Sequence, residues 1–164
     1  MVLGSLIFAP LADKIGRKPV TFAGVLLSAM AQSVMLVNTN LDFAYFLVFL
    51  IGLAMPMRVF IGYIYAMEFL PLKHTTLATG LTLGFDGLGI CLAALWFLYV
   101  DKDWKSFVGL STFWAYGTAV FIWCAIPESP KFLLSKGRYD EARQVIGRMK
   151  KYNGNTAWNF TESE

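Results

Sequence analysis

Charged residues are scarce in this chain. Of its 164 residues only 15% are Asp, Glu, Lys or Arg, whereas 57% are hydrophobic and 16% are aromatic. Soluble domains carry about 25% charged residues, and a chain of this length cannot hide so much apolar surface in a single core in water. The composition therefore excludes a soluble globular domain and predicts a membrane protein.

Reactive and metal-binding side chains are scarce as well. Cys91 and Cys124 lie inside apolar runs, and His74 is the one histidine. Thiols in such surroundings are usually small buried hydrophobic residues, so we expect no disulfide framework and no metal site. The sequence has no pairing of a nucleophile with a base and no basic face of the kind that binds nucleic acid. We therefore expect no enzymatic activity, no cofactor and no nucleic-acid partner.

Long apolar runs predict the fold. A helix needs about 20 apolar residues to cross the bilayer core, and segments of roughly that length are 20–37, 43–67, 77–100 and 107–126. Segment 1–11 is about half as long, so we interpret it as one end of a span or as a short re-entrant segment. We expect an all-α membrane protein whose transmembrane bundle, residues 1–126, has four full spans and one partial span.

The basic residues lie in alternate loops. Segment 13–19, loop 68–76 and the tail after residue 126 contain three, one and seven Lys and Arg residues, and the two intervening loops contain two in total. By the positive-inside rule the basic segments share the cytoplasmic side, or its equivalent in an organelle. Both the plasma membrane and an organelle membrane, such as the mitochondrial inner membrane, fit this pattern.

The tail is more polar than the bundle. Ser129 can cap a helix that has Pro130 at its first position, and Gly137 ends that helix. A second helix follows, with acidic residues in its first turn and one apolar stripe. We expect residues 127–152 to form an amphipathic helical segment on the cytoplasmic face, and residues 153–164 to form a loose tail.

Two charges lie inside the predicted spans. Arg58 and Asp86 are each about nine or ten residues from the cytoplasmic end of their span, roughly 14–15 Å deep. Charges at that depth are costly in lipid and usually face the interior of a bundle. Three hypotheses follow: an Arg58–Asp86 ion pair, a polar site for a charged substrate or a proton, or a separate partner for each charge.

Two other features of the spans concern packing. Pro56, two residues before Arg58, frees a backbone carbonyl and predicts a helix kink, which can serve gating or packing. Gly80 and Gly84 have the Gly-x-x-x-Gly spacing that permits close helix approach. We expect tight packing on the glycine face of segment 77–100.

Three motifs in the predicted cytoplasmic segments resemble those of one family. "DKIGRK", residues 13–18, resembles the Gly-x-x-x-Asp-Arg/Lys-x-Gly-Arg-Arg/Lys loop of the major facilitator superfamily. "PESPKFLLSKGRYDEA", after the last span, resembles the Pro-Glu-Ser-Pro-Arg-Trp-Leu segment after helix six of organic-ion transporters and sugar porters. "MEFLPLKHTT", residues 67–76, resembles the loop after helix four of organic-ion transporters. The chain is thus similar to the N-terminal half of such a transporter, helices two to six.

The resemblance implies roles for the charged residues. It implies a cytoplasmic ion-pair network that holds the two halves of a transporter together in the outward-facing state, formed by Asp13, Arg17, Glu68, Glu128 and Lys131. The loop motif itself comprises Asp13, Lys14, Gly16, Arg17 and Lys18, with Gly16 allowing the tight turn. Arg58 and Asp86 would face a central cavity between the two halves.

The chain also departs from the family pattern. Ala9 replaces the first glycine of the loop motif, and Val48 and Thr75 replace family arginines. Lys131 and Phe132 replace Arg-Trp, and lysine does not reproduce a bidentate arginine. Relative to the family, helix one, the outer half of helix two and the second half are missing.

Two functions stay open at this point. In the first hypothesis the chain is a transporter-derived accessory subunit, embedded in lipid and packed against other membrane subunits, that does not transport alone. The missing arginines and the initiating Met1 favour it. In the second hypothesis the chain is part of a secondary transporter of small organic ions or sugars. The well-preserved "DKIGRK" and "PESP" segments favour the second.

Overall fold

The computed structural model describes residues 2–152, and all the regular secondary structure in that range is helical. The predicted loose tail, 153–164, lies outside the described residues. The helices are α1 (Val2–Ile15), α2 (Arg17–Val37), α3 (Leu41–Pro56), η1 (Met57–Ile61), α4 (Gly62–Met67), α5 (Leu72–Tyr99), α6 (Trp104–Ala125), α7 (Pro130–Ser135) and α8 (Tyr139–Tyr152).

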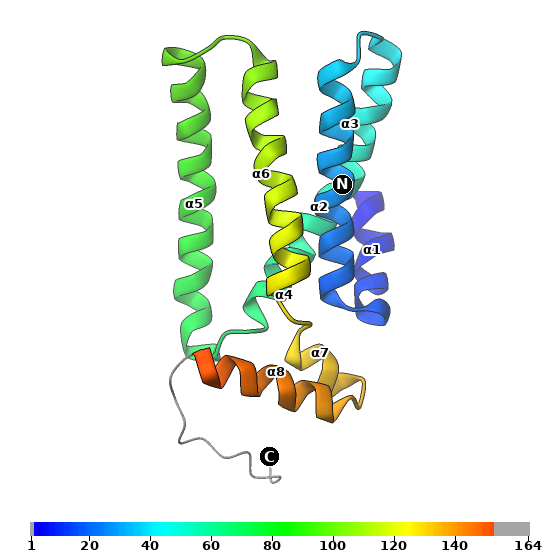
Figure 1. Cartoon of the computed structure of the whole chain (residues 1–164), viewed down its shortest axis with the longest axis vertical. Coiled ribbons are helices and arrows are strands. Elements are labelled where there is room, and N and C mark those ends of the chain that lie inside the picture. Colours follow the sequence, from blue (N-terminus) through cyan, green and yellow to red (C-terminus); the bar gives the residue numbers. More distant parts are fainter. Residues whose placement is uncertain (1, 153–164) are drawn as a thin grey trace.

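Within residues 2–152, four helical segments are long and apolar enough to cross a bilayer. They are α2, the continuous series α3–η1–α4, α5 from His74 onward, and α6. These segments match the four predicted spans, and α1, with 14 residues, matches the partial span. Figure 1 shows α2, α5 and α6 running side by side, with α8 lying across their lower ends. The chain is therefore an all-α, multi-pass integral membrane protein.

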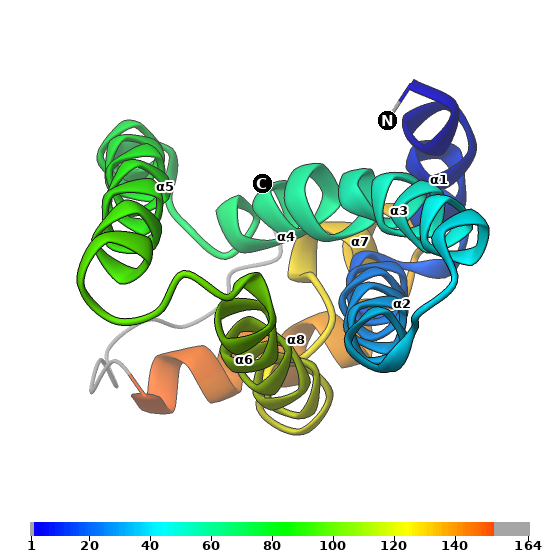
Figure 2. The same ribbon diagram turned by 90° about the horizontal axis from the view of Figure 1, so that it is seen from above.

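The second span changes helix type in its middle. Pro56 has no N–H to donate to the carbonyl of Gly52, and the five residues that follow it, Met57–Ile61, form a π-helix. Figure 2 shows the series α3–η1–α4 running along one side of α2 and α6, from the α1 side toward α5. Pro56 thus stands directly before the irregular turn that carries Arg58.

The closest packing surrounds α2, which contacts α1, α3, η1, α4 and α6. A Cβ atom placed on Gly24 would lie 2.4 Å from Cβ of Met57, so only glycine lets α2 and η1 approach this closely. One apolar cluster joins α1, α2 and η1 through Ala12, Val20, Met57 and Ile61. A second joins α2 and α6 through Val25, Ala119 and Ile122.

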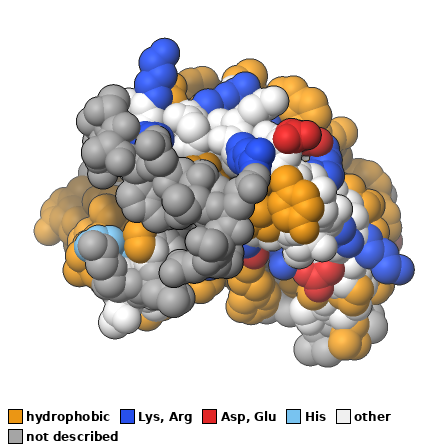
Figure 3. Space-filling model, turned by 90° about the horizontal axis from the view of Figure 1, so that it is seen from below, with side chains coloured by type: hydrophobic (Ala, Val, Ile, Leu, Met, Phe, Trp, Pro, Cys, Tyr) orange, Lys and Arg blue, Asp and Glu red, His pale blue; other side chains and the backbone are white. Residues whose placement is uncertain are grey.

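The two short helices at the basic end form as expected. The hydroxyl of Ser129 accepts a hydrogen bond from the N–H of Phe132 at 3.2 Å, which caps α7. Gly137, with a φ of 71°, lies in the turn between α7 and α8. A third apolar cluster, Leu133, Ala142 and Val145, packs α7 against α8. Figure 3 shows Lys and Arg side chains spread over this face of the molecule, seen from below.

Helix α5 lies apart from the other spans. None of its residues from 74 to 99 is buried. Its contacts include a hydroxyl pair between Tyr63 and Thr79 at 2.6 Å, and tilted ring contacts of Trp96 and Phe97 with Phe107. The predicted tight packing at Gly80 and Gly84 is wrong, because a Cβ on either residue would meet no described atom within 4 Å. No described helix covers that face.

Candidate functional site

A cluster of polar side chains surrounds the junction between α1 and α2. Gly16 alone separates the two helices, and its φ of 126° is a conformation that L side chains rarely adopt. A Cβ on Gly16 would also lie 2.4 Å from Oε2 of Glu128. Glycine is therefore required twice here, for the turn itself and for the approach of the carboxylate.

Glu128 caps the start of α2. Its Oε1 accepts hydrogen bonds from the backbone N–H groups of Arg17 and Lys18, both at 3.0 Å, and from its neighbour Ser129 at 3.0 Å. The first N–H groups of a helix have no partner within the helix, and the helix dipole favours an anion at that end. Because Glu128 follows α6, this carboxylate ties the start of α2 to the end of α6.

The side chain of Arg17 joins two more helices to this junction. Its Nη1 pairs with Asp13 on α1, and its Nε lies 3.4 Å from Oε1 of Glu68, which follows α4. Arg17 and Glu68 are only 19% and 14% exposed, so water screens their interaction weakly, whereas Asp13 is 66% exposed. The second oxygen of Glu68, Oε2, is buried and has no hydrogen-bond partner among the described residues.

Two further side chains bind the carbonyl end of α6 and the segment after it. Nζ of Lys18 donates to the carbonyl of Trp123 at 2.9 Å and lies 5.6 Å from the centre of the indole ring. The hydroxyl of Tyr65 on α4 donates to the carbonyl of Pro127. We name the whole group the junction cluster: Asp13, Arg17, Lys18, Tyr65, Glu68 and Glu128.

Two of the charged residues predicted in the loop motif and the cytoplasmic ion-pair network lie outside the junction cluster. Lys14 and Lys131 are both exposed, and neither forms an ion pair within the part of the chain that is described. Lys131 lies on α7, while Oε1 of the nearby Glu128 is already bound to backbone N–H groups. The ion-pair role that the resemblance implies for Lys131 therefore has no counterpart in this structure.

Sequence reasoning missed Tyr65 and the mode of action of Glu128. The one signal for Tyr65 was its place one helical turn before Glu68. The resemblance suggested side-chain ion pairs for Glu128, but its Oε1 binds backbone N–H groups more than 100 positions away in the sequence. Contacts of that range depend on the tertiary arrangement.

The two intramembrane charges do not meet. Arg58 lies on η1 and is partly buried, and its Nε is buried with no hydrogen-bond partner in residues 2–152. Asp86 is exposed on α5, which stands apart from η1 (Figure 2). The Arg58–Asp86 ion pair is thus absent from this structure, because α5 does not pack against the second span at that depth. Arg58 is left as a partly buried cation whose Nε has no partner among the described residues.

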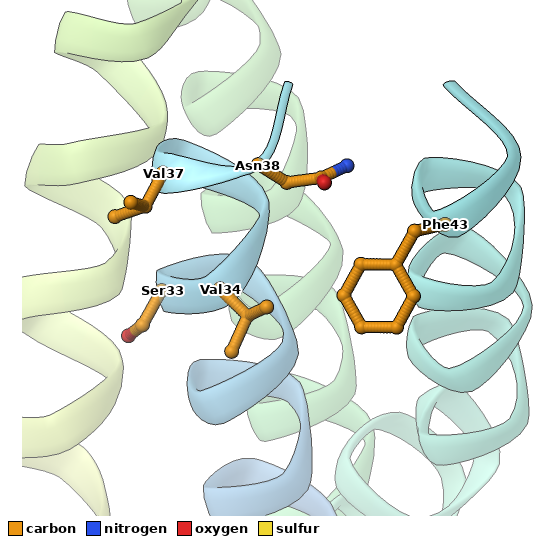
Figure 4. A pocket seen from close by; sticks show the side chains of 5 residues that line it. All are labelled: Ser33, Val34, Val37, Asn38 and Phe43. Atoms are coloured by element: carbon orange, nitrogen blue, oxygen red, sulfur yellow. The ribbon is translucent and has the colours of Figure 1, made fainter. Parts of the chain in front are cut away.

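An apolar cavity of about 380 Å³ lies at the opposite end of the bundle, between α2 and α3. Figure 4 shows the ring of Phe43 facing Val34, with Asn38 above them. Ser33 lies on the same wall, and its hydroxyl is bonded to the carbonyl of Ala29 at 2.8 Å. No charged side chain is among the described residues that line this cavity, so it provides no ion pair for a charged ligand.

The sequence matches the family model for sugar (and other) transporters over residues 1–163. The chain belongs to this transporter family, within the major facilitator superfamily. The resemblance inferred from the three loop motifs is thereby confirmed.

Several curated relatives are similar to this transporter-family chain. Solute carrier family 22 member 16 of Homo sapiens is 31% identical over 99% of the chain and 28% of its own length. The organic cation transporter protein of Drosophila melanogaster is 33% identical, over 93% of the chain and 28% of its own length. The organic cation/carnitine transporter 2 of Homo sapiens is 27% identical, over 94% of the chain and 28% of its own length. The chain therefore spans little more than a quarter of these relatives.

The family assignment gives the junction cluster a context. Its members come from the "DKIGRK" loop, the end of α4 and the "PESP" segment, which are the three motifs that carried the resemblance. The structure brings all three motifs together at one end of the bundle. In this member of the transporter family the motifs thus form one contact site that joins α1, α2, α4 and α6.

Proposed function

We propose that this chain forms part of a secondary carrier that moves a small organic cation bearing a carboxylate across a membrane. The observation that carries the proposal is the side chain of Arg58, a partly buried guanidinium whose Nε has no described partner. Two relatives support the cationic part of the substrate through their names, one an organic cation transporter and one an organic cation/carnitine transporter.

Arg58 favours a substrate that also carries a negative charge. A buried cation without a counter-ion is costly in a membrane, and it repels a substrate that is only cationic. A carboxylate can accept two parallel hydrogen bonds from a guanidinium. The π-helical turn that holds Arg58 supports a site here, because such turns frequently occur at functional sites. Asp86 supplies an intramembrane anion that can attract the cationic group of the same substrate.

The junction cluster serves a different purpose in this proposal. Secondary carriers expose a site near the midplane to each side in turn, largely by rigid-body movement of their parts. The cluster links α1, α2, α4 and the end of α6 at their basic ends. It therefore lets these helices move as one unit while the region around Arg58 changes its exposure.

The accessory-subunit hypothesis is the second candidate. One observation favours it: Lys131, which the family pattern would place in the ion-pair network, is exposed and outside the junction cluster. A subunit that does not transport has no need of that contact. The comparisons give this hypothesis no support.

Uptake by the full-length protein in proteoliposomes distinguishes these candidates. The probes are a labelled betaine, which carries a carboxylate, and labelled tetraethylammonium, which does not. We expect Arg58→Gln to lower kcat/KM for the betaine by about 10- to 100-fold, because hydrogen bonds to charged groups contribute about 1.5–3 kcal/mol. Uptake of tetraethylammonium should not fall, and Arg58→Lys should retain part of the betaine uptake.

The matched control is Lys102→Gln, which removes an exposed cation from the opposite end of the bundle. Equal losses for both probes in Arg58→Gln would contradict the carboxylate contact. No uptake of either probe, together with recovery of the protein at fixed stoichiometry in a larger complex, would overturn the carrier proposal and favour the accessory subunit.

A further inference from the structure

A second cavity, of about 850 Å³, lies at the basic end of the bundle. One wall is the end of α6 and the residues after it, including Cys124 and Ile126. The other wall is the last part of α8, including Arg148, Met149 and Lys151. The cavity therefore lies where a membrane-spanning helix meets an amphipathic helix, at the depth of the lipid headgroups.

The α6 wall continues into exposed apolar surface. Val120, Phe121 and Trp123, in the turn before the cavity, are 62%, 60% and 57% exposed. Cys124 and Ala125 are exposed as well. An acyl chain can therefore run along α6 and enter the cavity without leaving an apolar surface.

The α8 wall supplies positive charge that the described protein does not neutralise. Arg148 and Lys151 are exposed, and neither forms an ion pair in residues 2–152. The carboxylates of neighbouring elements have other partners: Glu68 binds Arg17, and Glu141 binds Arg138. Glu128 caps α2. Asp140, at the other end of α8, is roughly 12 Å from the nearer of these cations along the helix.

We propose that this cavity binds one anionic phospholipid, with its headgroup on Arg148 and Lys151 and an acyl chain along the end of α6. The occupant follows from charge and apolarity together. Two unpaired cations at the headgroup level attract an anionic lipid, whereas a soluble anion would leave the apolar wall uncovered. This inference requires only that the chain is inserted in a membrane and does not depend on which substrate it carries.

Cys124 provides a direct probe, because its thiol lies in the cavity wall. The experiment uses the full-length protein with Cys91→Ser, so that Cys124 is the thiol of this segment that reacts. The protein is placed in nanodiscs of phosphatidylcholine alone or with 20% phosphatidylserine, and alkylation by a small maleimide is followed. We expect phosphatidylserine to slow the alkylation of Cys124 at least threefold.

Two charge variants test the role of the cations. The double variant R148Q/K151Q should abolish the slowing, whereas R148K/K151R, which keeps both charges, should retain it. The matched control K131Q/K136Q removes two lysines of the α7 region outside the cavity and should also retain it. Inorganic phosphate is added to nanodiscs of pure phosphatidylcholine at a concentration that supplies as much negative charge as the phosphatidylserine. It should not slow the alkylation of Cys124.

Three results would overturn the proposal. They are an equal rate of alkylation in the two lipid compositions, an equal slowing in R148Q/K151Q and in the unsubstituted protein, and protection by inorganic phosphate alone. Native mass spectrometry of the same samples gives an independent measurement. It should show one retained phosphatidylserine for the protein and for K131Q/K136Q, and none for R148Q/K151Q.

Discussion

Helices α2 and α5 are both uninterrupted apolar spans, yet they have opposite surroundings. In the most apolar window of α2, 39% of the residues are buried by other helices, and in that of α5 none is. Helix α2 is capped by Glu128 at its start and packed against η1 through Gly24. Helix α5 has no buried residue from 74 to 99 and turns its glycines toward open space.

The difference shows that an apolar sequence is enough to predict a membrane span. It does not predict which other helices that span will contact. Both helices carry glycine, but a Cβ on Gly24 would lie 2.4 Å from Cβ of Met57, whereas a Cβ on Gly84 would meet no described atom within 4 Å. The packed helix is also the one with charged partners at its end. The contacts of α2 thus combine a capped polar end, the close approach at Gly24 and two apolar clusters, and the described part of the chain gives α5 none of these.

The largest expected difference in stability is between two variants that each replace one of these glycines by alanine. Gly24→Ala should lower the free energy of unfolding by about 3 kcal/mol, because the new Cβ overlaps Met57 and the backbone of Arg58. Gly84→Ala should raise it by up to about 1 kcal/mol, the difference in helix propensity between alanine and glycine. Unfolding in mild detergent, titrated with SDS and followed by circular dichroism, measures both. An equal change in the free energy of unfolding for the two variants would contradict the conclusion that α2 is packed at its glycine and α5 is not.

A smaller difference in stability should distinguish Arg17, which is paired with Glu68, from Arg58, which has no described ion-pair partner. Arg17→Met should lower the free energy of unfolding by about 1–2 kcal/mol, because it leaves the mostly buried carboxylate of Glu68 without its partner. Arg58→Met should leave the stability unchanged or raise it, since the Nε that it removes has no described partner. The same SDS titration applies. A loss in Arg58→Met as large as that in Arg17→Met would mean that Arg58 is paired in the membrane.

The smallest effect concerns the loop between α5 and α6. The hydrogen bond that Ser106 donates holds the pKa of Asp101 below its usual range. A lowered pKa in the folded state stabilises the fold above the pKa of the unfolded chain, and this stabilisation is lost as the pH falls through the folded value. Ser106→Ala should raise the pKa of Asp101 and flatten that part of the pH dependence. Carboxyl NMR of the labelled protein measures the pKa, and an unchanged value would contradict the contact.

The spans and the end helices were predictable because they depend on local patterns. Apolar runs of about 20 residues, Ser129 followed by Pro130, and the acidic first turn of α8 each specify a helix or its end from neighbouring residues. The three loop motifs also predicted the family, which the comparison over residues 1–163 confirms.

The remaining contacts were not predictable because they join distant parts of the chain. Gly80 and Gly84 have the spacing of a packing motif, but spacing does not supply the second helix. Similar depths of Arg58 and Asp86 did not bring them together, since α5 diverges from the second span. Only the folded chain shows that Glu128 reaches the N–H groups of Arg17 and Lys18 and that Tyr65 reaches Pro127.

The central claim is that Glu128 ties the start of α2 to the end of α6 while α5 stays independent. Pulsed electron resonance tests it with spin labels at positions 14 and 136, and with a second pair at 14 and 77. The account predicts a narrow distance distribution for 14 and 136 that broadens in Glu128→Ala and not in the control Glu141→Ala. The pair at 14 and 77, neither of which lies in the segment after Glu128, should be unaffected by Glu128→Ala. An unchanged distribution for 14 and 136 in Glu128→Ala would contradict the account.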